Sequence, residues 1–323
     1  MAEIIYFGTN GCSGHYPIGI DKTLTGAEYK MWCECDKTEI KTKKIMEESL
    51  AKKIDAAIKL LQSTCKNEVV ELCYSGGKDS DVILKLAKLA GIKYRAIYRC
   101  TTIDPPGTIA HCIENNVEII RPSKSFLNLI REKGFPTRRA RFCCEKLKEY
   151  KILDRAIQGI RRCESYKRAK NYKEPTICRI YGSKKNCVEV ILPILNFSDK
   201  DIENFIIEYK IKLHPLYYNA DGSLNIKKRL GCMGCPLASD NGLSDFKKYP
   251  LLAKAWIRNG LIWWNNHPNA ACHKEYESVY ELFVSNVFFK SLAETKLAID
   301  GGLFGEKIDC KKFLEDYFNI KFE

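Results

Sequence analysis

The spacing of hydrophobic and polar residues predicts alternating strands and helices in the first part of the chain. In residues 39–62, apolar side chains recur at intervals of three or four, as on one face of an amphipathic helix. Residues 69–74 and 94–100 are short apolar runs of the kind that form buried strands. Between these two runs lies a helical pattern over residues 81–90, which Gly91 would end. Strand, helix and strand in this order form a βαβ unit, so a parallel sheet is expected.

The later part of the chain adds strands and then changes to a helical pattern. Residues 117–120 and 189–192 are the next strand candidates, and Ser198 is a suitable N-cap for a helix over 198–209. From residue 246 onward the apolar spacing is helical. We therefore predict an α/β fold with a doubly wound, mainly parallel sheet of five or six strands, followed by a helical, cysteine-bearing C-terminal lobe.

Changes in composition divide the chain into three predicted regions. Residues 1–45 are rich in Gly, Thr and Cys and show no clear period, so we expect a small N-terminal appendage. Residues 46–215 carry the strand and helix pattern of the α/β domain. Residues 216–323 hold a Cys-x-x-Cys loop and the helical lobe.

The overall composition is that of a globular protein, because 45% of the 323 residues are apolar and 29% are charged. No apolar run approaches the ~18 residues of a membrane span, and the first residues lack a secretory-signal pattern. The chain nevertheless contains 16 cysteines. We therefore expect a cytoplasmic protein without a membrane partner, in which some cysteines hold a metal or a cluster and do not form a disulfide framework.

The positive charge is concentrated in one segment. The chain has a formal net charge of +13, and residues 121–173 contain 17 basic and 5 acidic residues, a local net charge of +12. Such a segment suits a polyanion, and the candidates are nucleotide phosphates, sulfate and a nucleic-acid backbone. A solvated helix face is the alternative interpretation.

The most informative motif is a glycine-containing turn between the first predicted strand and its helix. Its sequence is Ser75-Gly76-Gly77-Lys78-Asp79-Ser80. Two glycines allow a sharp turn, and the free N–H groups at a helix N-terminus attract an anion. Lys78 would add a full charge, the two serines would add hydroxyl donors, and Asp79 is a candidate ligand of Mg²⁺. The motif is not a Walker A loop, because Asp79 follows the lysine where Ser or Thr would be required.

This turn resembles the SGGxDS signature of the PP-loop ATP pyrophosphatase superfamily. Later segments resemble the phosphoadenosine-phosphosulfate reductase family, and the resemblance covers roughly residues 65–270. The segments that carry it are Thr101–Pro106, Gly134–Lys148, Gly159–Ser165 with Arg168, Pro193–Ser198 with Asp201, and Gly231–Pro236. One departure is Gly107, which stands where relatives usually carry Glu. The resemblance implies a PP-loop domain that binds an adenine nucleotide, either ATP or adenylyl sulfate (APS) or phosphoadenylyl sulfate (PAPS), with Mg²⁺.

The resemblance also implies a set of site residues, among which Lys78, Asp79 and Arg161 are the catalytic candidates. Planar guanidinium groups suit phosphate and sulfate oxygens, and Glu164 would orient one of them. An Arg161–Glu164 pair is also ordinary i,i+3 helix pairing. The implied nucleotide-binding residues are Ser75, Gly76, Gly77, Lys78, Asp79, Ser80, Thr102, Asp104, Arg138, Arg139, Arg141, Arg161, Glu164 and Arg168.

Two cysteine groups are candidate metal sites. The pair Cys143-Cys144 precedes Cys232-x-x-Cys235, a pattern that resembles the [4Fe–4S] ligands of adenylyl-sulfate reductases. Adjacent cysteines strain the ligation of one tetrahedral zinc, so zinc is the alternative, and redox thiols are a third interpretation. A second candidate, for Zn²⁺, lies in the N-terminal segment. Its members are Cys12, His15, Cys33 and Cys35.

One expected feature of sulfonucleotide reductases is missing. Their mobile tail carries Glu-Cys-Gly-x-His, whereas Cys310 here lies in Asp-Cys-Lys-Lys-Phe, so we expect Cys310 to be a helix residue. Our first prediction is therefore an ATP-dependent adenylating enzyme that transfers sulfur with an iron–sulfur cluster, with nucleic acid as a candidate acceptor and a thiol or sulfur-donor protein as a partner. The alternatives are an APS or PAPS reductase that uses a partner thiol, and a non-catalytic nucleotide-binding module of a larger assembly.

Overall fold

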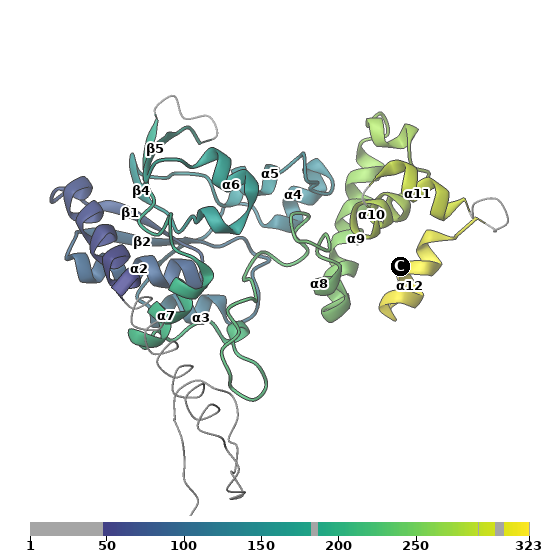
Figure 1. The fold of residues 1–323 in the computed structure, drawn as a ribbon. Helices are drawn as coiled ribbons and strands as arrows, with labels where there is room; N and C mark the ends of the chain where they lie inside the picture. Colours follow the sequence, from purple (N-terminus) through teal and green to yellow (C-terminus); the bar gives the residue numbers. More distant parts are fainter. Residues whose placement is uncertain (1–47, 182–186, 290, 301–306, 323) are drawn as a thin grey trace, which may run out of the picture.

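The computed structural model describes residues 48–181, 187–289, 291–300 and 307–322. It confirms the α/β prediction, because six strands form one sheet in the order β3-β2-β1-β4-β6-β5 (Figure 1). Every neighbouring pair is parallel except β5 and β6, which are antiparallel. The strands are β1 (Val70–Tyr74), β2 (Tyr94–Arg99), β3 (Glu118–Ile120), β4 (Arg155–Ile157), β5 (Thr176–Arg179) and β6 (Val188–Ile191).

The chain reverses its direction of winding between β1 and β4. From β1 it moves outward through β2 to β3, and it then returns to place β4 on the other side of β1. The register pairs Leu72 with Ala96 on one side and with Ile157 on the other. In open α/β sheets, the crevice at such a switch point lies beside the carboxyl ends of the strands and binds the ligand.

One face of the sheet is covered by helices. The helix over residues 48–65, α2 (Lys78–Ala90) and α7 (Asp199–Glu208) pack against it, and their apolar side chains join those of β1 and β2 in one cluster. In Figure 1, α2, α3 (Thr108–Glu114) and α7 lie together below the sheet. The other face holds a smaller cluster that includes Val188 and Val190 of β6.

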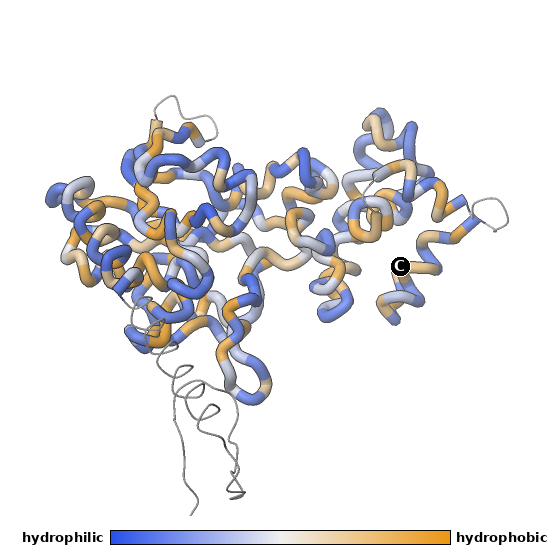
Figure 2. Tube along the Cα trace, viewed as in Figure 1, coloured by the Kyte–Doolittle hydropathy of each residue, from blue (hydrophilic) through white to orange (hydrophobic). Residues whose placement is uncertain are grey.

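The C-terminal helices form a second group with its own core. Figure 1 shows α8 to α12 apart from the sheet, with α4 (Phe126–Lys133) and α5 (Phe142–Leu147) between the two groups. Hydrophobic residues, orange in Figure 2, recur in both groups. The second core also includes side chains of α4. The division of the chain near residue 215 stays a prediction. The helices of this group are α8 (Leu243–Lys248), α9 (Pro250–Asn266), α10 (Val279–Phe288), α11 (Leu292–Ile299) and α12 (Cys310–Phe318).

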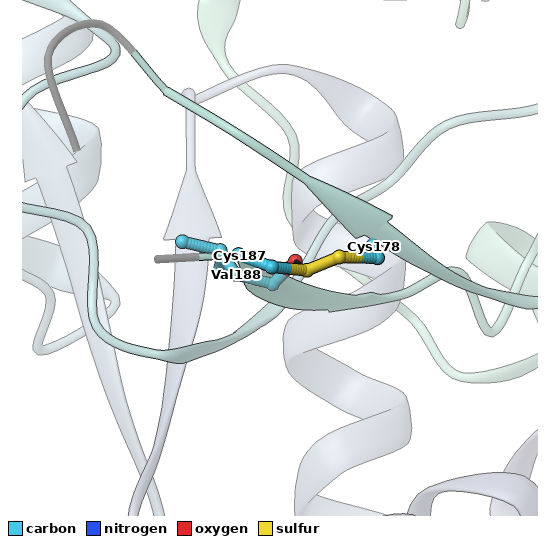
Figure 3. The surroundings of a disulfide bond; sticks show 3 residues. All are labelled: Cys178, Cys187 and Val188. Carbon is cyan, nitrogen blue, oxygen red and sulfur yellow. Dashed lines mark hydrogen bonds between the residues drawn. A yellow bond between two sulfur atoms is a disulfide. The ribbon is translucent and has the colours of Figure 1, made fainter. Parts of the chain in front are cut away.

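A disulfide joins Cys178 of β5 to Cys187, the residue before β6 (Figure 3). The two Cα atoms lie 5.7 Å apart, within the usual range for such a bond. The sequence predicted no disulfide. The bond links the two strands of the antiparallel hairpin at the edge of the sheet.

Within the described part of the chain, no helix is both long and apolar enough to cross a membrane.

Candidate active site

The phosphate-loop candidate lies where the sequence predicts it, between β1 and α2. Gly76 needs to be a glycine, because its φ is +76° and a Cβ there would approach Leu230 to 3.1 Å and Thr108 to 3.2 Å. Gly77 is the N-cap of α2, so the helix begins at Lys78, earlier than the predicted residue 81. The Ser80 hydroxyl donates to the Gly77 carbonyl at 2.6 Å and closes the turn.

The three predicted catalytic residues converge beside this loop. The Lys78 Nζ lies 3.6 Å from Asp79 Oδ2, and the Arg161 Nε lies 2.7 Å from Asp79 Oδ1. Arg161 is almost fully buried, and its Nη2 also lies 2.9 Å from Asp199 Oδ1. Two cations therefore already flank the Asp79 carboxylate. This arrangement does not fit Asp79 as a ligand of Mg²⁺, so we assign the ion no step.

A close main-chain approach holds Arg161 against the loop. Gly159, two residues before Arg161, lies so near the loop that an added Cβ would be 3.0 Å from the carbonyl oxygen of Asp79. The carboxylate of Glu164 accepts from the Arg161 main-chain N–H at 3.3 Å. Glu164 also pairs with Arg168, and its other oxygen lies 3.4 Å from Arg229. Glu164 therefore pairs with two arginines, Arg168 and Arg229, and its role toward a ligand stays a prediction.

The remaining predicted residues divide into two kinds. The Asp104 carboxylate accepts from the main-chain N–H and the hydroxyl of Thr101, both at 2.7 Å, and it lines a cavity. The Thr102 hydroxyl accepts from the N–H of Phe126 at 2.9 Å, so it fixes the start of α4. Arg138 donates to the Ala238 carbonyl at 2.9 Å. Thr102 and Arg138 thus make contacts within the protein, and their roles as nucleotide-binding residues stay predictions.

Arg139 and Arg141 are exposed, and both lie on the loop before α5. The structure gives them no contact with the phosphate loop among the described hydrogen bonds and ion pairs. They remain predictions as ligand-binding residues.

A cavity of about 210 Å³ opens beside the carboxyl ends of β1 and β2. Its lining includes Ser75 of the phosphate loop, Asp104, Lys148, Arg179 and Cys232. It is smaller than the ~300 Å³ or more that is usual for a whole drug-sized ligand. The cavity therefore suits a small group or one part of a larger ligand.

Two features of the site were not found from the sequence. The hydroxyl of Tyr217 accepts a hydrogen bond from the Lys78 main-chain N–H at 3.1 Å, and Asp81, in the first turn of α2, lies 3.0 Å from His111 Nε2. The Tyr74 hydroxyl also donates to Asp81. Burial is the main cause of a raised pKa for the Asp81 carboxyl. Asp81 follows directly after the loop, which is a signal that could have been used, whereas nothing in the local sequence marks His111 or Tyr217.

The four predicted cluster cysteines lie in one neighbourhood. The pKa of the Cys143 thiol is raised by its hydrogen bond to Cys144, by burial and by the charges of Cys144, Cys232 and Cys235. The hydrogen bond from Cys143, aided by the positive charges of Lys148 and Arg141, lowers the pKa of the Cys144 thiol to about 6.

The loop with the last two cysteines docks against the segment that follows the carboxyl end of β2. The Met233 N–H donates to the Ile103 carbonyl at 2.9 Å, and the Cys232 thiol lies 3.4 Å from the Thr101 hydroxyl. The charge of Cys232 is the main cause of a raised pKa for the Lys148 ammonium. Lys148 therefore lies between the cavity and the cysteines.

Four cysteine thiolates are the usual ligands of a [4Fe–4S] cluster, so the chemistry of this donor set fits the predicted group. Among the described residues, no group of three or more Cys, His, Asp or Glu side chains is arranged to hold a metal ion. The cluster and its zinc alternative therefore stay predictions. The second predicted metal site lies outside the described residues, because its members are Cys12, His15, Cys33 and Cys35.

Two thiols outside this group, those of Cys310 and Cys163, differ in their surroundings. Cys310 is buried at the start of α12, as predicted for a helix residue, and burial raises the pKa of its thiol to about 11. Cys163 is exposed, and its sulfur accepts from Arg161 Nη1 at 2.9 Å. Partial desolvation raises the pKa of the Cys163 thiol, so the pKa of neither thiol is lowered as an activated nucleophile requires.

Comparison with protein-family models gives one match, the phosphoadenosine phosphosulfate reductase domain, over residues 70–238. No curated protein matches the chain. Among solved structures, the Candida auris phosphoadenylyl-sulfate reductase is 14% identical, with a TM-score of 0.36 over 53% of this chain and 87% of that one.

Two further solved structures resemble the chain to a similar degree. The Candida glabrata FMN adenylyltransferase is 13% identical, with a TM-score of 0.37 over 55% of this chain and 62% of that one. The Francisella tularensis NMN synthetase is 11% identical, with a TM-score of 0.33 over 84% of this chain and 93% of that one. The chain thus matches less than two thirds of the adenylyltransferase. These three likenesses carry no argument about function.

Proposed function

The chain belongs to the phosphoadenosine phosphosulfate reductase domain family, and on that premise we propose that it is a nucleotide-processing enzyme that adenylates an acceptor with ATP and prepares it for sulfur transfer. The observation that carries the proposal is the convergence of Lys78 and Arg161 on Asp79 at the N-terminus of α2. A buried arginine and a lysine at a helix N-terminus form a site for phosphate oxygens.

The proposed reaction has two steps. An oxygen of the acceptor attacks the α-phosphorus of ATP, the bond from that phosphorus to the bridging oxygen breaks, and pyrophosphate leaves with the electron pair. A partner protein then supplies sulfur as hydrosulfide, which bonds to the acceptor atom that carries the activated oxygen; the bond from that atom to the oxygen breaks, and AMP leaves with the oxygen and the electron pair. The loop N–H groups bind the departing phosphates, while Lys78 and Arg161 stabilise the charge that develops on them.

A [4Fe–4S] cluster is the proposed resident cofactor. Cys143, Cys144, Cys232 and Cys235 would hold it, and when bound it would supply electrons or a site for sulfur. Lys148 would keep a positive charge between these ligands and the nucleotide cavity. Iron and sulfide analysis of anaerobically purified protein tests this assignment, with zinc analysis for the alternative and for the N-terminal segment.

Reduction of APS or PAPS is the second candidate, and the family match favours it. Against it stands Cys310, whose buried thiol has a raised pKa and does not resemble a mobile tail nucleophile. A reductase of this kind would need a thiol from a partner.

Calorimetry separates the two candidates. We expect anaerobic full-length protein to bind ATP–Mg²⁺ more tightly than APS or PAPS, and Lys78→Ala to abolish this binding. Lys88→Ala is the matched control, since it removes the same charge from the exposed last turn of the same helix. The opposite ranking of ligands would favour the reductase. Binding of none of the three would refute the phosphate-loop assignment and favour a non-catalytic module.

Nucleic acid is the proposed acceptor class. Arg139, Arg141 and Lys146 are exposed next to the cysteine pair and belong to the basic segment 121–173. Anisotropy with a single-stranded oligonucleotide should show binding that weakens as salt rises, with a smaller salt dependence in Arg139→Ala/Arg141→Ala. If oligonucleotide affinity does not change with salt concentration, nucleic acid is excluded as the acceptor.

A further inference from the structure

An ion pair is buried in the face of the sheet opposite the helices, and its arginine, Arg99, also lines the cavity. Glu71 of β1 is fully buried and Arg99 of β2 is 6% exposed. The Arg99 Nη1 donates to Glu71 Oε1, and Nη2 donates to Oε2 at 3.0 Å. Two buried charges lose their hydration, and apolar residues of similar size are often as stable or more so. Stability alone therefore does not account for the pair.

The pair binds the main chain of one short turn. Arg99 Nε donates to the carbonyl oxygen of Tyr150 at 2.7 Å, and Nη2 donates to that of Lys151 at 2.9 Å. In the other direction, the N–H of Leu153 donates to Glu71 Oε2 at 3.1 Å. Three main-chain groups between residues 150 and 153 thus depend on these two side chains.

The turn needs such support because its backbone is strained. Lys151 has a φ of +52°, a left-handed conformation that an L-residue with a side chain seldom adopts. A strained residue of this kind persists only where the surrounding structure holds it, and such residues cluster at functional sites. The two carbonyl oxygens that Arg99 contacts belong to Lys151 and to Tyr150, the residue directly before it.

Residues that line the cavity directly precede the strained turn. Lys148 and Glu149 both line it, and Glu149 Oε1 lies 3.2 Å from Arg179, which lines it as well. Cys232 lines the same cavity as Lys148. We propose that the Glu71–Arg99 pair is a positioning device, which fixes the 150–153 turn and thereby sets Lys148 between the nucleotide cavity and the Cys232 loop. This inference rests on the proposed function only in taking the cavity ligand to be a nucleotide.

The first test measures the turn itself. Replacing the pair with apolar residues, Glu71→Leu/Arg99→Met, should preserve folding while amide hydrogen exchange in residues 148–153 accelerates at least tenfold. The matched control is Arg95→Met/Glu118→Leu, which removes an exposed pair between β2 and β3. Unchanged exchange in residues 148–153 would overturn the proposal, whether or not any nucleotide binds. If the double variant does not fold, Arg99→Lys replaces it, because a single ammonium cannot reach both carbonyls and Glu71 together.

The second test asks whether the pair acts through Lys148. Lys148→Met should weaken ATP–Mg²⁺ binding about tenfold, as expected for loss of one charge-assisted contact, and the apolar pair should do the same. Combining the three substitutions should weaken binding no further than Lys148→Met alone. If the losses of ATP–Mg²⁺ binding caused by Lys148→Met and by the apolar pair add fully in the combined variant, the pair does not act through Lys148. Absence of nucleotide binding by the unaltered protein would instead refute the proposed function, and the exchange result would then decide on the positioning device.

Discussion

The guanidinium group of Arg161 lies 2.7 Å from the carboxylate of Asp79, although 82 residues separate them in the chain. Gly159 permits this contact by lying against the main chain of Asp79, and Asp199 holds the other side of the guanidinium. The arginine is therefore fixed at the phosphate loop before any ligand arrives. A preorganised cation of this kind stabilises developing negative charge without rearrangement.

Removal of Arg161 should destabilise the protein and abolish nucleotide binding. Arg161→Met leaves the Asp79 carboxylate without its closest cation, so we expect the free energy of unfolding to fall by about 3 kcal/mol. Urea denaturation measures this change. Arg95→Met removes an exposed ion pair instead and should cost less than about 1 kcal/mol. If the free energy of unfolding falls equally in Arg161→Met and Arg95→Met, the buried ion pair stabilises the protein no more than the exposed one.

Tyr217 should stabilise the phosphate loop through its hydroxyl group alone. Tyr217→Phe keeps the ring but removes the acceptor of the Lys78 N–H, which should lower the free energy of unfolding by about 1–2 kcal/mol. The control is Tyr166→Phe, because the Tyr166 side chain is 86% exposed. A Tyr217→Phe protein as stable as the original would mean that water satisfies this N–H.

The elements with regular apolar patterns could be predicted from the sequence, whereas strands without a clear apolar run could not. The N-cap at Ser198 and the strands β1, β2, β3 and β6 are confirmed within one or two residues. β4 was missed because only two consecutive apolar residues follow Arg155, whose charge is paired outside the strand with Glu68 and Glu189. β5 is a half-buried edge strand that lacks a continuous apolar run.

The same distinction applies to the candidate site. Consecutive residues, such as those of the phosphate loop, carry their signal in the local sequence. The contact from Lys78 to Tyr217 spans 139 residues, and that from Asp81 to His111 spans 30. Such contacts depend on how the helices pack on the sheet, so neither the hydroxyl nor the imidazole has a local motif. The buried pair of Glu71 and Arg99 was missed because charged residues in apolar strands are normally taken as exposed positions.

Asp81 should make the stability of the protein depend on pH. Its pKa in the folded protein is raised above 3.8, so its contribution is complete below that pH and is lost as the pH rises through the raised value. Asp81→Asn cannot ionise. Urea denaturation at pH 4.5 and 7.5 should therefore show the variant gaining stability relative to the original protein at the higher pH. A gain at the lower pH would contradict the raised pKa.

Cys144 should be the most reactive of the cysteines near the cavity in metal-free protein. Its pKa is lowered to about 6, so iodoacetamide should modify it with a midpoint near pH 6. Cys310 in the same chain is an internal control, because its pKa is raised to about 11 and it should stay largely unmodified at pH 7. Mass spectrometry of peptides after brief alkylation measures both sites.

Two comparisons show what causes the reactivity of Cys144 and what suppresses it. Lys148→Met removes one of the positive charges that stabilise the thiolate, so the midpoint for Cys144 should move to higher pH. Cluster-loaded protein should resist alkylation at Cys144, because a sulfur that ligates iron is no longer a free nucleophile. Protection by added iron and sulfide, but not in Cys232→Ser/Cys235→Ser, would show that the two cysteine pairs hold the same group. Equal protection in that variant would mean that the Cys143-Cys144 pair acts without the Cys-x-x-Cys loop, and the four-cysteine assignment would then be wrong.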